Sequence, residues 1–411
     1  MIHIRPYNSE KDYEAIPRIW EEVGWIKRSE ALDVTANSFV SSGRALVAEI
    51  DGTTECQVSS MPGAMRYLET NIRFSGVTAV ATGYVARKQG LAARLTARLV
   101  AEDTAAGIQV MGLGMFEQGF YNQLGFGTAP YTRWVSFDPA QLQIAAKARI
   151  PKRLTSNDWE AVHAARLTRM RGHGACILFP PDVSRVEMIA HSGFGLGYYD
   201  GVGGELSHYL WMMSEGNESG PYTVQWMTYQ NGAQLLELVA LMHTLGDQIR
   251  LIRLKEPYGV QFQDFIRQPF RFQILTSEGK FDNNNQADAR QQYRICDLEG
   301  SLAQTHLPGE TVRFNLALTD PVSAFLDDDI AWRGLSGDYI VTLGPESAAV
   351  PGNDAALPTL KATVNAFTRL WLGVRQPSYL ALSDALSGPP ELFAALDRVL
   401  RLPVPEMDWD F

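Results

Sequence analysis

The chain has 411 residues, which is enough for two or three domains with cores of their own. Apolar residues make up 45% of it and charged residues 20%, as in an ordinary globular protein, and no segment approaches the roughly 18 apolar residues of a membrane span. The formal net charge of −10 argues against a nucleic-acid partner, whose phosphates would be repelled, and suits a cationic small molecule or a basic peptide. An acidic balance that serves only solubility is an equally simple reading.

The N-terminus and the cysteines point to the cytoplasm. Residues 1–20 are polar and alternating, unlike the apolar stretch of a signal peptide. The three cysteines, Cys56, Cys176 and Cys296, are odd in number and fit no zinc spacing, which is typical of a reducing compartment. The seven histidines show no metal spacing either. We therefore predict a cytoplasmic protein that binds no metal.

Residues 1–140 predict a first domain that mixes strands and helices. The alternating segment IHIRPYN precedes an acidic amphipathic helix, and RALVAEIDG predicts a strand that ends in the hairpin signal Asp51-Gly52. A long helix begins at Gly90, GIQVMGLGMF predicts a buried strand, and FYNQLGFG predicts a short helix closed by glycine. The alternating segment TRWVSFD predicts the last strand of this domain.

Two further domains are expected, over residues 141–290 and 291–411. The second begins with a helix in TSNDWEAVHAARLTRMRG, for which Ser156 or Asn157 is the expected N-cap. Its strand–helix–strand order repeats that of the first domain without the glycine loop. The third has two strands, TVRFNLALTD and GDYIVTLGPES. Three helical stretches follow: TLKATVNAFTRLWLG, SYLALSDALSG and PELFAALDRVL. The chain as a whole is expected to be of the α+β class.

The stretch VARKQGLAARLTARLV, residues 85–100, places a basic loop at the start of a helix. Backbone N–H groups at a helix start have no intrahelical partner and carry partial positive charge, so they suit an anion such as a pyrophosphate. Gly90 would let the backbone approach the anion closely, and Arg87 and Lys88 would add charge. The loop is neither a Walker loop nor a dinucleotide fingerprint, because the required glycines are missing. On these residues alone, an ordinary helix start is as good an interpretation.

The loop has the R-x-x-G-x-A pattern and resembles the pyrophosphate loop of the GNAT superfamily of N-acetyltransferases. The resemblance implies acetyl-CoA as co-substrate, with backbone N–H groups of the preceding strand polarising the acetyl carbonyl. The cofactor-binding residues that it implies are Val80, Ala81 and Thr82 on the strand, Arg87, Lys88, Gln89, Gly90, Leu91, Ala92 and Ala93 at the loop and helix start, and Phe116 and Glu117 after the next strand.

Residues 119–127, GFYNQLGFG, resemble the segment of the same superfamily whose tyrosine lies near the thioester sulfur. The resemblance implies that Tyr121 protonates the leaving thiolate. A phenol of pKa near 10 is a sensible acid toward a thiolate of pKa about 8.5. The alternative is a core aromatic residue on a short helix.

Over its full length the chain resembles the enhanced intracellular survival (Eis) family. That resemblance implies a GNAT domain at 1–140, a second, degenerate GNAT-like domain at 141–290 and a sterol-carrier-protein-like domain at 291–411. It further implies a homohexamer that acetylates amines of aminoglycoside-like molecules or lysine. The specific motifs lie within residues 80–127 and at the C-terminus.

In that family the chain ends in an aromatic residue whose carboxylate acts as general base. The resemblance therefore implies that the terminal carboxylate of Phe411 removes the proton from the attacking amine, while Asp410 adds negative potential. An α-carboxyl has a pKa near 3.5 in water, so it needs a partly desolvated site or a bridging water to work as a base. A frayed terminus is the alternative.

Other interpretations stay open. The third domain could bind a lipid beside an inactive GNAT domain, and a large apolar cavity within 291–411 would favour that function. A longer acyl group is a further possibility, because Gly112 and Gly114 would leave room for it. The first helix offers a wall for a cationic substrate, although a solvated acidic face is as good a reading. The residues of that wall are Trp20, Glu21, Glu22 and Trp25.

Overall fold

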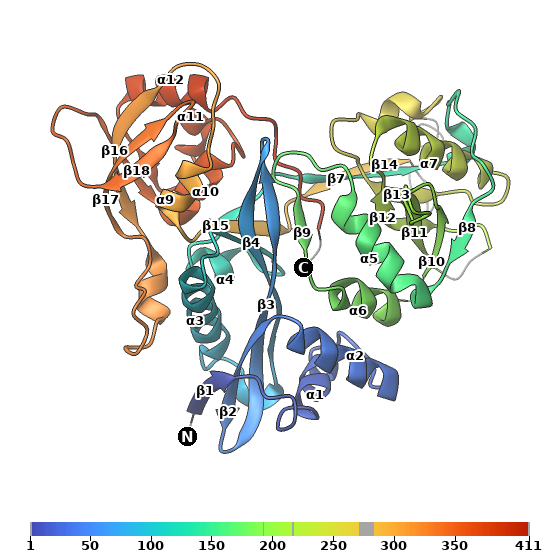
Figure 1. Cartoon of the computed structure of the whole chain (residues 1–411), viewed down its shortest axis with the longest axis horizontal. Helices are drawn as coiled ribbons and strands as arrows, with labels where there is room; N and C mark the ends of the chain where they lie inside the picture. Colours follow the sequence, from blue (N-terminus) through green and yellow to red (C-terminus); the bar gives the residue numbers. More distant parts are fainter. Residues whose placement is uncertain (1, 192, 216–217, 271–282, 410–411) are drawn as a thin grey trace. The chain divides into compact units, whose positions relative to one another are not determined.

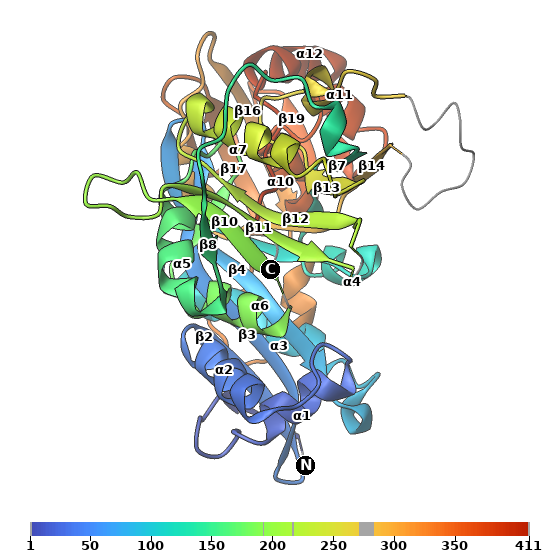
Figure 2. The same cartoon turned by 90° about the vertical axis from the view of Figure 1, so that its right-hand side faces the viewer.

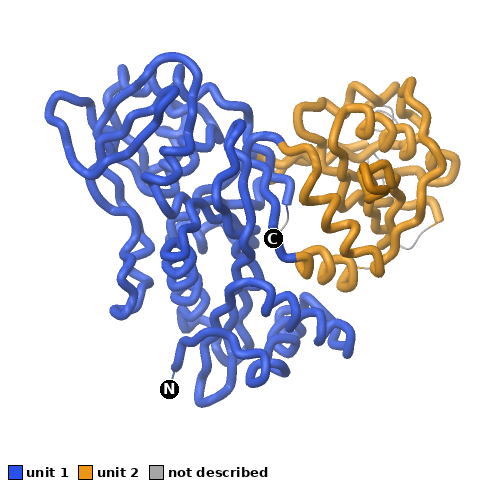
Figure 3. The backbone as a smooth tube through the Cα atoms, in the orientation of Figure 1, with its two compact units in different colours: residues 1–130, 172–180, 289–411 blue, residues 131–171, 181–288 orange. Residues whose placement is uncertain are grey.

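The structure, a computed structural model, describes residues 2–191, 193–215, 218–270 and 283–409. Two compact units make up the chain (Figure 3). Unit 1 consists of residues 1–130, 172–180 and 289–411, and unit 2 of residues 131–171 and 181–288. Unit 2 is therefore inserted into unit 1, and the chain returns to unit 1 twice.

The first sheet of unit 1 has the order β1-β2-β3-β4-β5-β15-β6, and β9 pairs with β3 at one side (Figure 1). One face is covered by α3, whose Leu91, Leu95 and Leu99 lie in the same core cluster as Val58 of β3. The opposite face carries α1, where the buried Trp20 donates a hydrogen bond from its indole to the Gln57 side chain, at 3.0 Å. The strands are β1 (Ile2–Pro6), β2 (Arg44–Ile50), β3 (Thr53–Tyr67), β4 (Thr70–Thr82), β5 (Val110–Gly114), β6 (Gly127–Thr128), β9 (Cys176–Leu178) and β15 (Gln291–Ile295). The helices are α1 (Ala15–Glu22), α2 (Glu30–Ser41), the 3₁₀ turn η1 (Tyr84–Ala86), α3 (Leu91–Ala105) and α4 (Gln118–Asn122).

The parallel strands β4 and β5 separate before β4 ends. Their pairing runs from Phe74 opposite Val110 to Val77 opposite Leu113, whereas β4 continues to Thr82. Ala79 has a φ of 51°, and the β3–β4 register shifts between Gln57 and Ser59, which marks a bulge at this point. A bulge bends a strand and increases its twist, so it turns the end of β4 away from β5.

A second sheet of unit 1 holds the C-terminal residues, in the order β18-β17-β16-β19-β20. Its core face buries Phe314, Leu316 and Val341, and Phe367 and Leu370 of α10 are buried too. The elements are α9 (Leu298–Ala303), β16 (Val312–Thr319), η5 (Pro321–Phe325), β17 (Gly337–Leu343), β18 (Ala348–Pro351), β19 (Thr359–Thr363), α10 (Val364–Trp371), α11 (Pro377–Leu380), β20 (Leu386–Ser387) and α12 (Pro390–Val399).

Unit 2 is a sheet of order β14-β7-β13-β12-β11-β10-β8 with helices on both faces (Figure 2). Leu210 and Met212 of β11 share a core cluster with α7, and Tyr209 and Trp211 share another with α5 and α6. The parallel strands β12 and β13 flank α7, whose N-cap is Asn231. The elements are β7 (Thr132–Phe137), η2 (Pro139–Gln141), β8 (Lys152–Leu154), η3 (Ser156–Asp158), α5 (Trp159–Thr168), α6 (Asp182–Ala190), β10 (Phe194–Tyr198), β11 (His208–Ser214), β12 (Tyr222–Thr228), α7 (Gly232–Thr244), β13 (Ile252–Lys255), η4 (Phe262–Phe265) and β14 (Asn284–Asp288).

Three segments lie in different sheets from those that the expected domain boundaries at residues 140 and 290 imply. The strand at Thr132–Phe137, expected to end the first domain, pairs with β13 and β14 in unit 2. The strand at Gln291–Ile295, expected in the third domain, pairs with β5 and β6 in the first sheet. Residues 172–180, expected in the second domain, contribute β9 to unit 1. An alternating pattern predicts a strand but not the partner with which it pairs.

Candidate active site

The basic loop leaves the end of β4 and leads into an uncapped helix. Gly90, the N-cap residue of α3, has a φ of 72°, and no side chain caps the first turn. A Cβ atom at this glycine would meet nothing within 4 Å, so the approach to the helix start is open. The first N–H groups of α3 therefore face an accessible, positively polarised position where an anion can bind.

The loop residues have different local roles. Arg87 and Lys88 are exposed, and the Arg87 guanidinium lies over the Tyr84 ring, 4.8 Å from its centroid. The Gln89 amide donates a hydrogen bond to the Val85 carbonyl oxygen at 3.1 Å, which braces the loop. The two basic side chains are thus the ones available to pair with a phosphate.

Residues 91–93 can meet a ligand only through their backbone. Leu91 and Ala93 are buried with exposed fractions of 1% and 4%, and both lie in the core cluster beneath α3. Ala92 is partly buried against the same cluster. The apolar side chains thus hold the helix on the sheet, and their N–H groups form the anion position.

The end of β4 presents backbone donors on the side that β5 has left. Gly83 donates its N–H to the Glu55 carbonyl oxygen of β3 at 2.8 Å. Because donors alternate along a strand, the N–H groups of Val80 and Thr82 point to the opposite edge. Ala81, opposite Gln57 of β3, is buried. Of the three expected strand residues, Val80 and Thr82 therefore have donors on the edge that faced β5.

The residues after β5 include one exposed and one buried aromatic ring. Phe116 is 80% exposed, whereas Tyr121 on α4 is 2% exposed. The Tyr121 ring lies 4.8 Å from that of Phe120, and burial raises the pKa of the Tyr121 phenol well above its usual value. Glu117 accepts a hydrogen bond from the Gly119 N–H as the N-cap of α4, so its carboxylate has a local structural role.

The loop and α4 come off the same edge of the sheet. Strands β4 and β5 are parallel, so their carboxyl ends lie at one edge. Arg87 and Gly90 follow the end of β4, and Phe116 and Tyr121 follow the end of β5. In sheets with parallel strands, ligands bind outside the carboxyl ends. The structure therefore brings the sequence-predicted anion loop and the sequence-predicted acid to one edge.

The C-terminal segment is docked on β9 as far as it is described. The Glu406 N–H donates to the His173 carbonyl oxygen at 2.6 Å, and the Asp408 carboxylate accepts from the Cys176 N–H at 3.2 Å. The Trp409 side chain is 1% exposed. The segment thus runs parallel to β9 and is anchored in unit 1. Asp410 and Phe411 lie outside the described residues.

His173 supports this docking only as a neutral ring. Its Nδ1 accepts from the Leu68 N–H at 3.1 Å, so the proton is on Nε2, which lies 3.1 Å from the Leu372 carbonyl oxygen. Burial lowers the pKa of His173 to about 4. Because the unfolded chain binds this proton from pH 6.5 downward, we expect the free energy of unfolding to fall by about 3 kcal/mol between pH 6.5 and pH 4 on this account.

Urea unfolding curves at several pH values measure this loss. A His173→Gln variant, which cannot titrate, is expected to show a correspondingly shallower fall over the same range. Equal slopes for both chains would contradict the assignment to His173.

The prediction that residues of the first helix line a cationic substrate is wrong for Trp20. Trp20 is buried and hydrogen-bonded to Gln57, so it cannot face a substrate. Glu22 forms an ion pair with Arg18 at 2.7 Å and accepts from the Tyr84 N–H at 2.7 Å, which ties α1 to the loop. Glu21 and Trp25 are exposed. Sequence spacing gave no signal for the link between Glu22 and η1, because 61 residues separate them in the chain.

Two further features are a side-chain cluster in unit 2 and a pocket in the C-terminal sheet of unit 1. In unit 2, ligand atoms of Asp200, His208 and Glu237 lie within 4.8 Å of one another, a grouping that histidine spacing did not indicate. The Arg149 guanidinium pairs with both carboxylates, at 2.5 and 2.8 Å, so each carboxylate that could bind a metal already has a cationic partner. We therefore assign no metal to this cluster.

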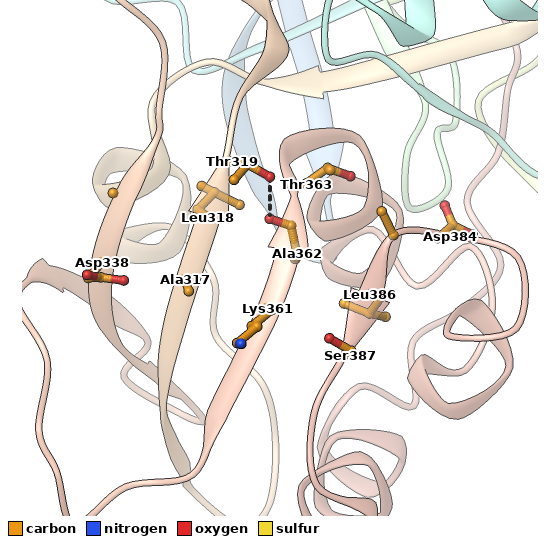
Figure 4. Close-up of a pocket in the computed structure, with 12 residues that line it drawn as sticks. Ala317, Leu318, Thr319, Asp338, Lys361, Ala362, Thr363, Asp384, Leu386 and Ser387 are labelled. Carbon is orange, nitrogen blue, oxygen red and sulfur yellow. Dashed lines mark hydrogen bonds between the residues drawn. The ribbon is translucent and has the colours of Figure 1, made fainter.

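In the C-terminal sheet, a pocket of about 650 Å³ lies over β16, β17, β19 and β20 (Figure 4). Lys361 stands on β19 in its middle, and the core side chains of the sheet are buried. Its lining combines apolar side chains with polar ones. The polar residues that line it are Thr319, Asp338, Lys361, Thr363, Asp384 and Ser387. In the described part of the chain, no helix is long and apolar enough to span a bilayer.

Comparisons with known proteins agree with this architecture. Solved structures with the same fold over the whole chain include a probable N-acyltransferase of Enterococcus faecalis, with a TM-score of 0.79 and 15% identity. A GCN5-related N-acetyltransferase of Anabaena variabilis gives 0.76 and 13%, and Eis1 of Mycobacterium abscessus gives 0.75 and 14%. In each of these three comparisons the match covers 100% of both chains. At these identities the likeness shows the fold alone.

Sequence comparison gives a narrower result. No curated protein matches the chain. Residues 3–129 match the family model described as an acetyltransferase (GNAT) domain. This range contains β1 to β5, the anion loop and the helix with Tyr121. The match to an acetyltransferase (GNAT) domain thus covers the first part of unit 1, residues 3–129.

Proposed function

We propose that this protein is an acetyl-CoA-dependent N-acetyltransferase that acts on amines of cationic, aminoglycoside-like small molecules or of lysine. The observation that carries the proposal is the edge where β4 separates from β5 beyond Val77. There, the uncapped start of α3 behind Gly90 and the buried Tyr121 follow the ends of two parallel strands. The match of residues 3–129 to a GNAT domain supports the same reaction class.

In the proposed reaction, the nitrogen of a neutral amine attacks the carbonyl carbon of the acetyl thioester. The N–H groups of Val80 and Thr82 stabilise the oxyanion that forms, and the first N–H groups of α3, with Arg87 and Lys88, bind the pyrophosphate. As the carbon–sulfur bond breaks, Tyr121 gives its proton to the thiolate. The products are the acetylated amine and the free thiol.

The base in this proposal is the terminal carboxylate of Phe411, which takes the proton released by the amine. The docked segment supports this role through its direction. From Glu406 to Asp408 it follows β9 toward Phe179, whose N–H donates to the Pro62 carbonyl oxygen of β3 at 2.9 Å. Pro62 lies opposite Ser75 of β4, two residues before β4 and β5 part at Val77. The segment thus leads toward the proposed site.

Several finer features of the proposal rest on the Eis-like fold. They are a second GNAT-like domain in unit 2, a sterol-carrier-protein-like C-terminal domain, a homohexamer and a cytoplasmic location. The parallel pair β12–β13 around α7 supports the second GNAT-like domain. The net charge of −10 supports a cationic acceptor.

Release of free thiol from acetyl-CoA, with a panel of acceptors that carry several amines, tests the function. Two glycines provide a matched pair of variants. Gly90 has a φ of 72° and Gly52 of 87°, and a Cβ atom at either would meet nothing within 4 Å. An alanine at each site carries a similar strain of about 1 kcal/mol.

Only the Gly90→Ala substitution places a methyl group at the proposed pyrophosphate position. We expect it to raise the KM for acetyl-CoA about tenfold, and Gly52→Ala to leave that KM unchanged. Equal KM values for the two variants would contradict pyrophosphate binding at this loop. Absence of thiol release from the native chain with every amine would contradict the function itself.

A further inference from the structure

We propose that Gln292 and Arg294 of β15, together with Asp320, are positioning residues that hold the helix of the catalytic tyrosine. This inference rests on the proposed function, in which Tyr121 is the general acid. All three residues lie outside residues 3–129, the part that matches the GNAT domain. The proposed site is therefore completed by residues that the chain supplies only after unit 2.

Helix α4 needs such support because it has only five residues, Gln118–Asn122. Isolated helices of this length are unstable in water. Its end is shaped by a tight turn in which the Tyr121 carbonyl oxygen accepts from the N–H groups of Leu124 and Phe126, at 3.0 and 3.2 Å. The direction of the Tyr121 side chain consequently depends on what fixes both ends of this helix.

Gln292 holds both ends of the helix. Its side-chain amide donates to the Gln118 carbonyl oxygen at 3.3 Å and to the Asn122 side-chain oxygen at 3.0 Å. A third contact joins the same amide to the Thr128 hydroxyl of β6, at 3.2 Å. One buried side chain thus ties the first and last residues of α4 to a strand of the sheet.

Arg294 fixes the turn that follows. Its guanidinium donates to the Leu124 carbonyl oxygen at 2.7 Å, and it is paired with the Asp320 carboxylate, whose Oδ1 lies at 3.0 Å. The side chains of Arg294 and Asp320 are both fully buried. Gly125 lies against the arginine with a φ of 84°, and a Cβ atom there would come 1.9 Å from the guanidinium. The turn and the arginine are therefore fitted to each other.

Asp320 extends this link to the C-terminal part of unit 1. Its carboxylate also accepts from the Val322 N–H at 3.1 Å and from the Leu335 N–H at 2.8 Å. Val322 and Leu326 share a core cluster with Tyr121 and with α3. On the surface of α3, Arg94 pairs with Asp327 at 2.8 Å. Residues 320–335 thus brace both helices of the proposed site.

Positioning of this kind affects the rate rather than cofactor binding. A displacement of about 1 Å from the productive geometry can reduce a rate on the order of a hundredfold. Gln292 and Arg294 contact the Tyr121 helix and make no hydrogen bond to the loop at Gly90 in the described residues. Their loss should therefore lower kcat and leave the KM for acetyl-CoA unchanged.

The first test is a Gln292→Met substitution. Methionine keeps the volume of the side chain and removes the amide donors, and the Gln292 Oε1 atom has no hydrogen-bond partner among the described residues. We expect kcat to fall roughly ten- to hundredfold with the KM for acetyl-CoA within twofold of the native value. A Tyr293→Phe variant is the control, because Tyr293 lies on the same strand and its side chain points to the opposite face.

The decisive comparison repeats Gln292→Met in a Tyr121→Phe background. If Gln292 acts through the tyrosine, the second substitution has no further effect once the phenol is gone. An equal loss in both backgrounds would mean a general structural role and would overturn the inference. An active native enzyme with a deficient Tyr121→Phe variant and a fully active Gln292→Met variant would overturn it as well.

Because an unpaired buried charge can prevent folding, the ion pair is tested by removing both partners together. In the double variant Arg294→Met/Asp320→Asn, the asparagine keeps an acceptor oxygen for the backbone N–H groups of Val322 and Leu335. The variant is expected to fold and to show the same loss of kcat, also absent in the Tyr121→Phe background. Full activity of this double variant would overturn the role of the pair. If the native chain itself transfers no acetyl group, the proposed function fails first and the inference with it.

Discussion

Adding a single glycine after Phe411 is expected to lower kcat for acetyl transfer about 10²–10⁴-fold, the usual contribution of a general base. The extension moves the terminal carboxylate about 3.5 Å along the chain, while the anchors at Glu406, Asp408 and Trp409 stay the same. Thiol release measured beside the native chain gives the effect directly.

A C-terminal amide at Phe411 is the matched control for added length, because it removes the charge without moving the residue. It should lose as much activity as the glycine extension. If both altered chains turn over like the native one, the carboxylate is not the base, although the acetyltransferase proposal itself survives. Thermal unfolding curves of the three proteins establish that the docked segment is undisturbed.

Replacing Tyr121 with phenylalanine is expected to reduce kcat by about 10²–10⁴-fold with acetyl-CoA, because the thiolate must then leave without a proton. The substitution removes only the hydroxyl from a side chain that is 2% exposed, so the packing against Phe120 is kept. The loss should shrink strongly with an aromatic acetyl thioester, whose thiol is acidic enough to leave as the anion. Equal losses with both thioesters would contradict acid catalysis by Tyr121.

The pH dependence of the native enzyme carries the same information. Burial raises the pKa of the Tyr121 phenol, so the protonated form persists to higher pH than for a free tyrosine. The acid therefore stays in its working form throughout the range from pH 7 to 10. A fall of kcat between pH 7 and 10 that is absent from the Tyr121→Phe variant would mean that Tyr121 loses its proton within this range. That result would contradict a raised pKa for its phenol.

Features set by neighbouring residues were predictable from the sequence. The long helix expected from Gly90 onward is present as α3, and its buried face carries the apolar side chains of Leu91, Leu95 and Leu99. The strand–helix–strand order of the second block is present in unit 2 as β12, α7 and β13. Short-range periodicity and backbone preference were sufficient for each of these features.

Finer local details were missed. The capping residue near the start of α5 is Thr155, in a capping box with Asp158, rather than Ser156 or Asn157, because several adjacent polar residues can each serve as a cap. The expected helix in SYLALSDALSG is reduced to α11 at Pro377–Leu380, and Leu386–Ser387 forms β20. Leu386 lies opposite Ala362 of β19, a pairing that overrides local helix preference.

Long-range partners could not be predicted at all. The role of β15 depends on pairing between Gln291 and Gly114, which are far apart in the sequence. The buried pair of Arg294 and Asp320 had no signal, since an arginine in an alternating strand more often faces water. The sequence suggested that Trp20 faces a cationic substrate, but its side chain is hydrogen-bonded to Gln57 instead. Tertiary packing thus decides which face of α1 is buried.

The position of β15 in the sheet also has a consequence for synthesis of the protein. Strand β5 must wait for its partner until the ribosome has made residues 115–290, which at roughly 5–20 residues per second takes about 10–35 s. During that time the apolar strand at Val110–Gly114 has an unpaired edge, which is a template for aggregation. Production of this protein should therefore benefit from slower expression at low temperature or from a chaperone that shields the nascent edge of β5.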